Sequence, residues 1–365
     1  MDVKDIGKKI ENVELVEAMH AVRENENKDT LKQLFESVVH AVFIVPAKFD
    51  QEPKPDENGK VTFQDGVKIN FSLLTNEQGD KVLPCFTDYE SMASSQFNDG
   101  FQRIILPYKQ LEDLVFNSNG NISGIAMNPF TENCFISGEF IRQLSSYAVS
   151  FFTAFVAAAI DAVMGMIIAW VLVRYDFPGK AIMDGIIELP FALPTAVAGI
   201  ALTHLTTTEG WVGAFFQKFG IKIAYTRLGI IVALVFIGIP FVVRAVQPVL
   251  EKIDIQYEEA ANILGANSRQ TMFRVILPEI LPSLIAGFTM SFARGLGEYG
   301  SVVFIAGNTP YETEIAPLMI MSKLQEFDYA SATSIALVML AAAFVILFIN
   351  AWLQSRASKI VSGIA

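Results

Sequence analysis

The chain has 365 residues, of which 52% are hydrophobic and 18% are charged, and its mean hydropathy is +0.41. These averages favour a membrane protein, but they combine two unlike parts. Residues 1–145 hold 14 Lys and Arg against 23 Asp and Glu, whereas the remainder holds 13 against 15. The acidic first part argues against nucleic acid as a partner, because phosphate binding needs clustered Lys and Arg, and it has no electrostatic reason to lie on an anionic membrane.

Residues 1–145 are predicted to form a soluble, mixed α/β (α+β) domain. The first 26 residues are charged throughout and lack an apolar core, so we expect no signal peptide. Cys85 and Cys134 could form one disulfide, but reduced thiols are favoured because a domain of this size needs no covalent staple. The predicted elements are helices over 13–22 and 30–39, a strand over 41–46, a polar loop over 51–60, strands over 67–74 and 81–87, a loop and helix over 104–116, and a strand over 122–128.

From Tyr147 onward the sequence contains five apolar stretches that are long enough to cross a bilayer. The second and fourth carry clusters of Pro or Gly, which break helices. Lipid offers no water to unpaired backbone groups, so broken segments survive only inside a bundle or beside a cavity. This pattern predicts a transporter core rather than a simple anchor. The stretches are 148–173, 181–205, 228–246, 280–306 and 332–353, and the clusters are Pro190, Pro194 and Gly199, and Gly295, Gly297 and Gly300.

Five ionisable residues fall in or near these stretches: Asp161, Asp184, Glu188, Arg294 and Glu298. Arg294 and Glu298 are four residues apart and can pair on one helix face. One interpretation places them beside a translocation path, where Arg294 offers a cation to a divalent anion. The other, which we favour, is a structural ion pair, because a fixed anion site would slow release. Asp161 is interpreted as a polar group in helix packing, and Asp184 and Glu188 as interfacial.

The loop between the third and fourth stretches is predicted to hold a short helix over 257–265, and the next helix is predicted to start at Pro278. Small residues allow another protein to approach closely, Gly permits a sharp exit, and Pro at a helix start loses no hydrogen bond. Such a helix can transmit a push from a soluble partner into the membrane. The residues that carry this prediction are Glu259, Ala260, Ala261, Gly265, Leu277 and Pro278.

This spacing resembles the EAA loop of ABC importer permeases, which reads E-A-A, three residues, G, nine residues and I-x-L-P. The chain matches at every place, with Val275 at the Ile position, so the loop is expected over about 251–278. Residues from about 146 to 354 further resemble CysT-type sulfate/thiosulfate permeases. That likeness rests on 170–180 (WVLVRYDFPGK), 191–199 (FALPTAVAG), 294–301 (RGLGEYGS) and 304–308.

The resemblance implies an all-α, polytopic, MetI-like permease core over residues 146–365, in the bacterial cytoplasmic membrane. It also implies four partners: an ABC ATPase, a second, CysW-like permease subunit, a periplasmic sulfate/thiosulfate-binding protein and membrane lipid. No Walker A sequence occurs, so ATP is expected to be hydrolysed by the ATPase subunit, with no cofactor, catalytic residue or metal site in this chain. Molybdate or tungstate is the alternative cargo. The candidate residues of the path or gate are Pro194, Thr195, Arg294, Glu298 and Ser301.

Residues from about 10 to 142 resemble the N-terminal domain of the SseB family, on 42–46, 73–79 (LLTNEQG), 83–88 (LPCFTD) and 124–130 (GIAMNPF). Because no catalytic constellation is visible there, an interaction module is favoured over an enzyme. A rival interpretation of the whole chain is a membrane-anchored interaction protein, in which this domain carries the activity.

The two resemblances conflict in topology. With the EAA loop in the cytoplasm, the third stretch runs inward, the second outward and the first inward, so the N-terminal domain falls outside. Permeases of this type usually have about six spans, and the match begins after their first. Either the domain is translocated, or the span count is wrong, or the chain is a fusion of two reading frames. We favour the fusion.

Overall fold

The computed structural model describes residues 10, 12–25, 27–50, 69–76, 79–118 and 121–362. The chain divides into two compact units, Met1–Arg142 and Gln143–Ala365. The loop predicted over 51–60 and the first two residues of the strand predicted over 67–74 lie outside the described residues.

The first unit combines helices with two β-sheets, one of order β2-β1-β5 and one of order β3-β4-β6-β7. An isolated bridge between Ile44 and Phe86 joins the two sheets, and both side chains are fully buried. Most pairs of strands are antiparallel, while β4 and β6 run parallel. The elements are α1 (Val13–Glu24), α2 (Lys28–His40), β1 (Val42–Phe49), β2 (Ile69–Phe71), β3 (Leu74–Thr75), β4 (Lys81–Cys85), α3 (Tyr89–Ala93), β5 (Gln102–Pro107), α4 (Tyr108–Asn117), β6 (Gly124–Met127) and β7 (Cys134–Ser137).

Two predictions for this unit are wrong in detail. The loop expected from residue 104 is the strand β5, because six of its residues pair with β1. The strand expected over 67–74 is interrupted, since β2 pairs with β1 in one sheet while β3 pairs with β4 in the other. Cys85 and Cys134 are unpaired, and burial raises the pKa of both thiols.

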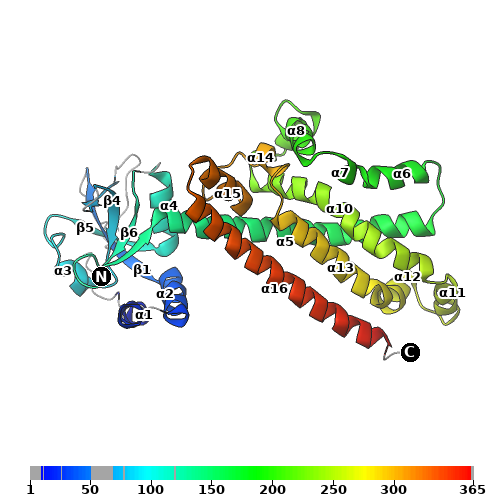
Figure 1. Cartoon of the computed structure of the whole chain (residues 1–365), viewed down its shortest axis with the longest axis horizontal. Helices are drawn as coiled ribbons and strands as arrows, with labels where there is room; N and C mark the ends of the chain where they lie inside the picture. The colour runs from blue at the N-terminus through cyan, green and yellow to red at the C-terminus, as the bar shows by residue number, and fades with distance from the viewer. Residues whose placement is uncertain are drawn as a thin grey trace, which may run out of the picture. The chain divides into compact units, whose positions relative to one another are not determined.

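The second unit is entirely helical, and Figure 1 shows its long helices α5, α10, α13 and α16 crossing one another as a bundle. Within the described residues four helical runs are long and apolar enough to span a membrane: Gly138–Arg174, Arg227–Lys252, Ser268–Leu296 and Tyr329–Trp352. The elements are α5 (Gly138–Arg174), α6 (Lys180–Ile187), α7 (Leu189–Ala192), α8 (Thr195–Thr206), α9 (Trp211–Gln217), α10 (Arg227–Lys252), α11 (Gln256–Ile263), α12 (Ser268–Thr271), a π-helix (Met272–Ile276), α13 (Leu277–Leu296), α14 (Val302–Ile305), α15 (Ala316–Gln325) and α16 (Tyr329–Ser362).

The second predicted span is broken into three helices, α6, α7 and α8, as its prolines indicated. Pro190 lies in the first turn of α7, where its missing N–H costs no bond. Leu193 adopts extended backbone with ψ 137°, the conformation that a following proline favours. The chain therefore crosses this region as short apolar pieces, which need the surrounding bundle to satisfy their free backbone groups.

The fourth predicted span has different ends from those expected. Helical backbone begins at Ser268, ten residues before Pro278, because the π-helix Met272–Ile276 leads directly into α13. The N–H of Leu277 donates to the carbonyl of Met272, a wider turn that accommodates the proline next to it. The helix ends at Leu296, and Gly297 begins a turn that separates it from α14.

Close helix crossings hold α5, α10 and α13 together. The side chain of Val242 on α10 lies where a Cβ of Gly165 would be, and its backbone approaches Gly287 in the same way. Asp161, which is fully buried on α5, accepts a hydrogen bond of 2.5 Å from Ser291 Oγ on α13. The prediction that Asp161 is a polar group in helix packing is confirmed.

Candidate coupling and gating site

The loop that follows α10 folds into the helix α11 and a sharp turn. Glu258 and Glu259 lie in the first turn of α11, where carboxylates interact favourably with the helix dipole. Gly265 has φ +83°, and the N–H of Ala266 donates to the carbonyl of Ala261 across it. This left-handed ending is one that glycine adopts without strain. The chain then enters α12 through a capping box in which Asn267 and Gln270 bond each other's backbone.

Two adjacent apolar residues of this loop are exposed. Ile263 and Leu264 are 85% and 88% exposed, and Tyr257 is also exposed. Leaving such side chains in water is unfavourable, and exposed apolar residues that lie together are typical of surfaces that contact another protein or a membrane. Sequence reasoning missed Ile263 and Leu264, although two large apolar residues just before the Gly of a polar loop were a visible signal.

The six residues predicted to couple divide into two groups. Glu259, Ala260 and Gly265 are exposed on the loop, and Ala261 is buried beneath it. Leu277 and Pro278 instead lie at the start of α13, and Leu277 packs on the core formed by α5, α10 and α13. The first group can contact a partner, while the second group joins the loop to a spanning helix.

The five residues predicted for the path or gate come together at one corner of the bundle. Pro194 precedes α8, and the Thr195 hydroxyl lies where a Cβ of Gly300 would be. A Cβ on Gly199 would lie 2.5–2.9 Å from the backbone of Ser301, so glycine is required at this crossing. The start of α8 therefore rests directly on the turn 297–301.

Glu298 organises that turn from a buried position. Its side chain accepts hydrogen bonds from the backbone N–H and the hydroxyl of Ser301, at 2.9 and 3.1 Å. Arg294 reaches it at 2.6 Å, and Glu298 is only 1% exposed whereas about a third of the Arg294 side chain is exposed. The predicted ion pair is confirmed. It is not made on one helix face, however, because α13 ends at Leu296 and Glu298 turns back toward it.

A second charged cluster joins α10 to the broken segment. Arg244 lies 2.9 Å from a carboxylate oxygen of Asp184 and 2.8 Å from one of Glu188. It also donates to the backbone carbonyl of Asp184. Sequence reasoning placed the two carboxylates at an interface but missed their common partner, because 60 residues separate Asp184 from Arg244.

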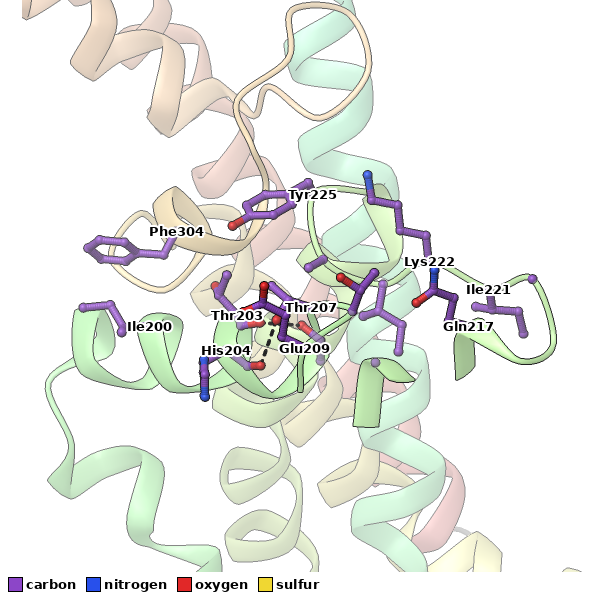
Figure 2. A pocket seen from close by; sticks show the side chains of 16 residues that line it. Ile200, Thr203, His204, Thr207, Glu209, Gln217, Ile221, Lys222, Tyr225 and Phe304 are labelled. Atoms are coloured by element: carbon purple, nitrogen blue, oxygen red, sulfur yellow. Dashed lines mark hydrogen bonds between the residues drawn. The ribbon is translucent and has the colours of Figure 1, made fainter. Parts of the chain in front are cut away.

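A cavity of about 980 Å³ opens beside the C-terminal end of α8. Figure 2 shows Thr203 and His204 of α8 on one wall, with Lys222, Tyr225 and Phe304 coming from other segments. The five predicted gate residues lie at the other end of α8, in the last turn of α13 and in the turn that follows it. Among the described residues, no group of three or more His, Cys, Asp or Glu could hold a metal ion.

The model of a protein family described as "Binding-protein-dependent transport system inner membrane component" matches residues 161–359. The chain belongs to this family. It is therefore a multi-pass permease subunit of an ABC transporter in the inner membrane. As in this family generally, the ATPase is a separate subunit of a complex served by a binding protein, and no cofactor belongs to the permease. The model of the SseB protein N-terminal domain matches residues 15–143.

Curated relatives of this permease include two proteins named "Sulfate transport system permease protein CysT", from Escherichia coli (strain K12) and Salmonella typhimurium. Each is 51% identical over 222 residues, which cover 61% of this chain and 80% of the relative. A protein of the same name from Synechococcus elongatus is 50% identical over 216 residues, which cover 59% of this chain and 78% of the relative.

Among solved structures, a bacterial ABC transporter that imports the acidic polysaccharide alginate matches with TM-score 0.51 and 19% identity. The match covers 60% of this chain and 80% of that one. At this identity the likeness shows the fold alone, and it confirms the predicted all-α permease core, which here follows an α/β domain.

Proposed function

We propose that this permease translocates sulfate or thiosulfate and is driven by a separate ATPase that docks on the loop at about 251–278. The observation that carries the proposal is the exposed pair Ile263 and Leu264, which stands beside the left-handed turn at Gly265. The names of the relatives support the cargo. In this proposal residues 1–145 form the SseB-like domain and residues 146–365 form the permease domain.

The working unit contains a second, CysW-like permease, two ATPase subunits, and a periplasmic binding protein that delivers the anion. ATP-driven closure of the ATPases moves α11, and the bundle then changes between inward-facing and outward-facing states. Glu259, Ala260, Ala261 and Gly265 form the contact, and Leu277 and Pro278 pass the movement into α13.

The gate in this proposal is the corner formed by Pro194, Thr195, Arg294, Glu298 and Ser301. Because Glu298 neutralises Arg294, a passing divalent anion meets a weakened cation and is not held tightly. Small movements of α8 against the turn 297–301 would open or close this corner, since the two segments are in backbone contact.

Co-purification with a sulfate-type ATPase subunit tests the coupling, with wild type compared with Glu259→Lys and Gly265→Asp. Both substitutions are expected to abolish capture, because Lys reverses the charge of Glu259 at the contact and Asp adds a charged side chain at the exposed turn. The exposed Glu279 on α13 provides the control Glu279→Gln, which should capture the ATPase as wild type does. A wild-type chain that captures no ATPase would contradict the proposal.

Uptake of sulfate by the assembled complex tests the cargo, with molybdate and tungstate as competitors. Sulfate uptake that only thiosulfate suppresses supports the proposal, and preferential molybdate uptake would overturn it. We propose that the N-terminal domain is an interaction module. Transport retained after deletion of residues 1–137 is expected, and its loss would favour the rival role, in which that domain carries the activity.

A further inference from the structure

The C-terminal residue of α5, Arg174, makes three contacts at the root of the coupling loop. Its Nη2 donates to the backbone carbonyl of Ile253, at the end of α10, over 3.1 Å. Its Nε lies 2.9 Å from a carboxylate oxygen of Glu258, in the first turn of α11. Its guanidinium also lies over the ring of Trp170, one turn earlier on α5. Both charged side chains are largely buried, with 12% and 21% of Arg174 and Glu258 exposed.

Little else holds α11 to the bundle. Of the eight residues of this helix, all of which the structure describes, only Ala261 is buried. The end of α5 is rigid by contrast, because Ala169 and Leu172 pack with Leu250 of α10 and Ile276 of the π-helix in one buried cluster. A charged contact of low exposure therefore joins a weakly packed helix to a firmly packed one. Removing one partner of such a contact leaves the other charge poorly hydrated and uncompensated, so the two helices resist separation.

We propose that Arg174 is a positioning residue that couples α11 directly to α5, so that a movement imposed on α11 reaches the first span as well as α10 and α13. The chain itself connects α11 only to α10 and α12. The pair between Arg174 and Glu258 adds a connection to a helix that lies more than 80 residues away in sequence. This inference rests on the proposed function, since it assumes that the ATPase moves α11.

The test uses the full chain in its purified complex with the partner permease and ATPase, in proteoliposomes. Sulfate uptake and ATP hydrolysis are measured for wild type, Arg174→Gln, and the charge-swapped pair Arg174→Glu with Glu258→Arg. We expect Arg174→Gln to retain ATPase capture and hydrolysis but to move about tenfold less sulfate per ATP, the size of a typical coupling between sites. The swapped pair should recover part of this ratio.

The matched control is Lys180→Gln, which breaks the neighbouring ion pair with Asp176. That pair is 3.0 Å long, but Asp176 is 99% exposed, so the ratio of sulfate to ATP should not change. If Arg174→Gln lowers uptake and hydrolysis in equal proportion, Arg174 has only a structural role and the inference is overturned.

Hydrogen exchange of the α11 amides separates this inference from the proposed cargo. Exchange over 256–263 should be faster in Arg174→Gln than in wild type and in Lys180→Gln, whatever anion the complex carries. Unchanged exchange in Arg174→Gln would overturn the inference. A wild-type complex that moves no sulfate would overturn the proposed cargo and leave the exchange result valid.

Discussion

Two regions of the permease unit contain similar residues but differ in burial. The coupling loop and the gate corner each combine a glutamate, Glu259 or Glu298, with glycine at a sharp turn. On the loop, Glu259 and the apolar side chains next to it are exposed. At the corner, Glu298 is buried and satisfied by Ser301 and Arg294 within the chain. The loop glutamate is thus available to a partner, whereas the corner glutamate has its partners within the chain.

The largest effect should come from the buried carboxylate. Glu298→Ala leaves the buried N–H of Ser301 without an acceptor and Arg294 without its partner, so we expect a loss of about 2–3 kcal/mol in the free energy of unfolding. Thermal unfolding in detergent measures it. The control is Glu279→Ala, which removes an exposed carboxylate at the start of α13. If the two variants were equally stable, the buried Glu298 would contribute no more to folding than an exposed carboxylate does.

The exposed side of the comparison predicts an effect on association rather than on folding. Leu264→Ser should weaken capture of the ATPase by about tenfold, as expected for an apolar interface anchor worth about 1.4 kcal/mol or more, with little change in stability. Titration of the ATPase subunit measures the affinity. Phe219→Ser, an exposed apolar residue in the loop after α9, serves as the control. If Phe219→Ser lost as much ATPase affinity as Leu264→Ser, the affinity would not depend on this loop in particular.

The turn itself should contribute less. Gly265→Ala places a Cβ where no described atom lies within 4 Å, so its cost is the strain of φ +83°, about 1–2 kcal/mol. We expect Gly265→Ala to bind the ATPase several-fold more weakly than wild type. Gly265→Asn should lose less affinity, because asparagine tolerates this conformation better than alanine does. Gly185→Ala in the helix α6, with equal space and no positive φ, should be neutral. If Gly265→Ala bound the ATPase as tightly as wild type, the left-handed turn would not require glycine for binding.

The smallest effect extends the same contrast of burial to the N-terminal domain. Burial raises the pKa of the Cys85 thiol well above its usual value and that of Cys134 less markedly. Because the thiolate is the reactive form, alkylation near pH 7 should be slow at Cys134 and slower still at Cys85, and both rates should rise with pH. Mass spectrometry of the labelled chain measures the order. Faster labelling of Cys85 would contradict the buried strand β4.

Much of the site could be predicted from sequence because its signals are local. Residue spacing alone predicted the helix of the coupling loop, its glycine turn and the ion pair of Arg294 with Glu298. The continuous helical run that leads into α13 begins at Ser268, ten residues before the predicted start at Pro278, because a π-helix can carry backbone past a proline and leaves no clear pattern in the residues. Ile263 and Leu264 stand out in the sequence as apolar residues in a polar loop, but only the structure shows that both side chains are exposed.

By itself, the sequence determined the class of protein: long apolar segments indicate a membrane protein, and the loop residues resemble the EAA motif of importer permeases. It also determined where helices break, because proline and glycine act on their own backbone. The tertiary structure decided which distant charges meet. Arg174 with Glu258, and Arg244 with Asp184 and Glu188, pair across helices that are far apart in the chain. Their encounter depends on packing between helices, which no local pattern of residues encodes.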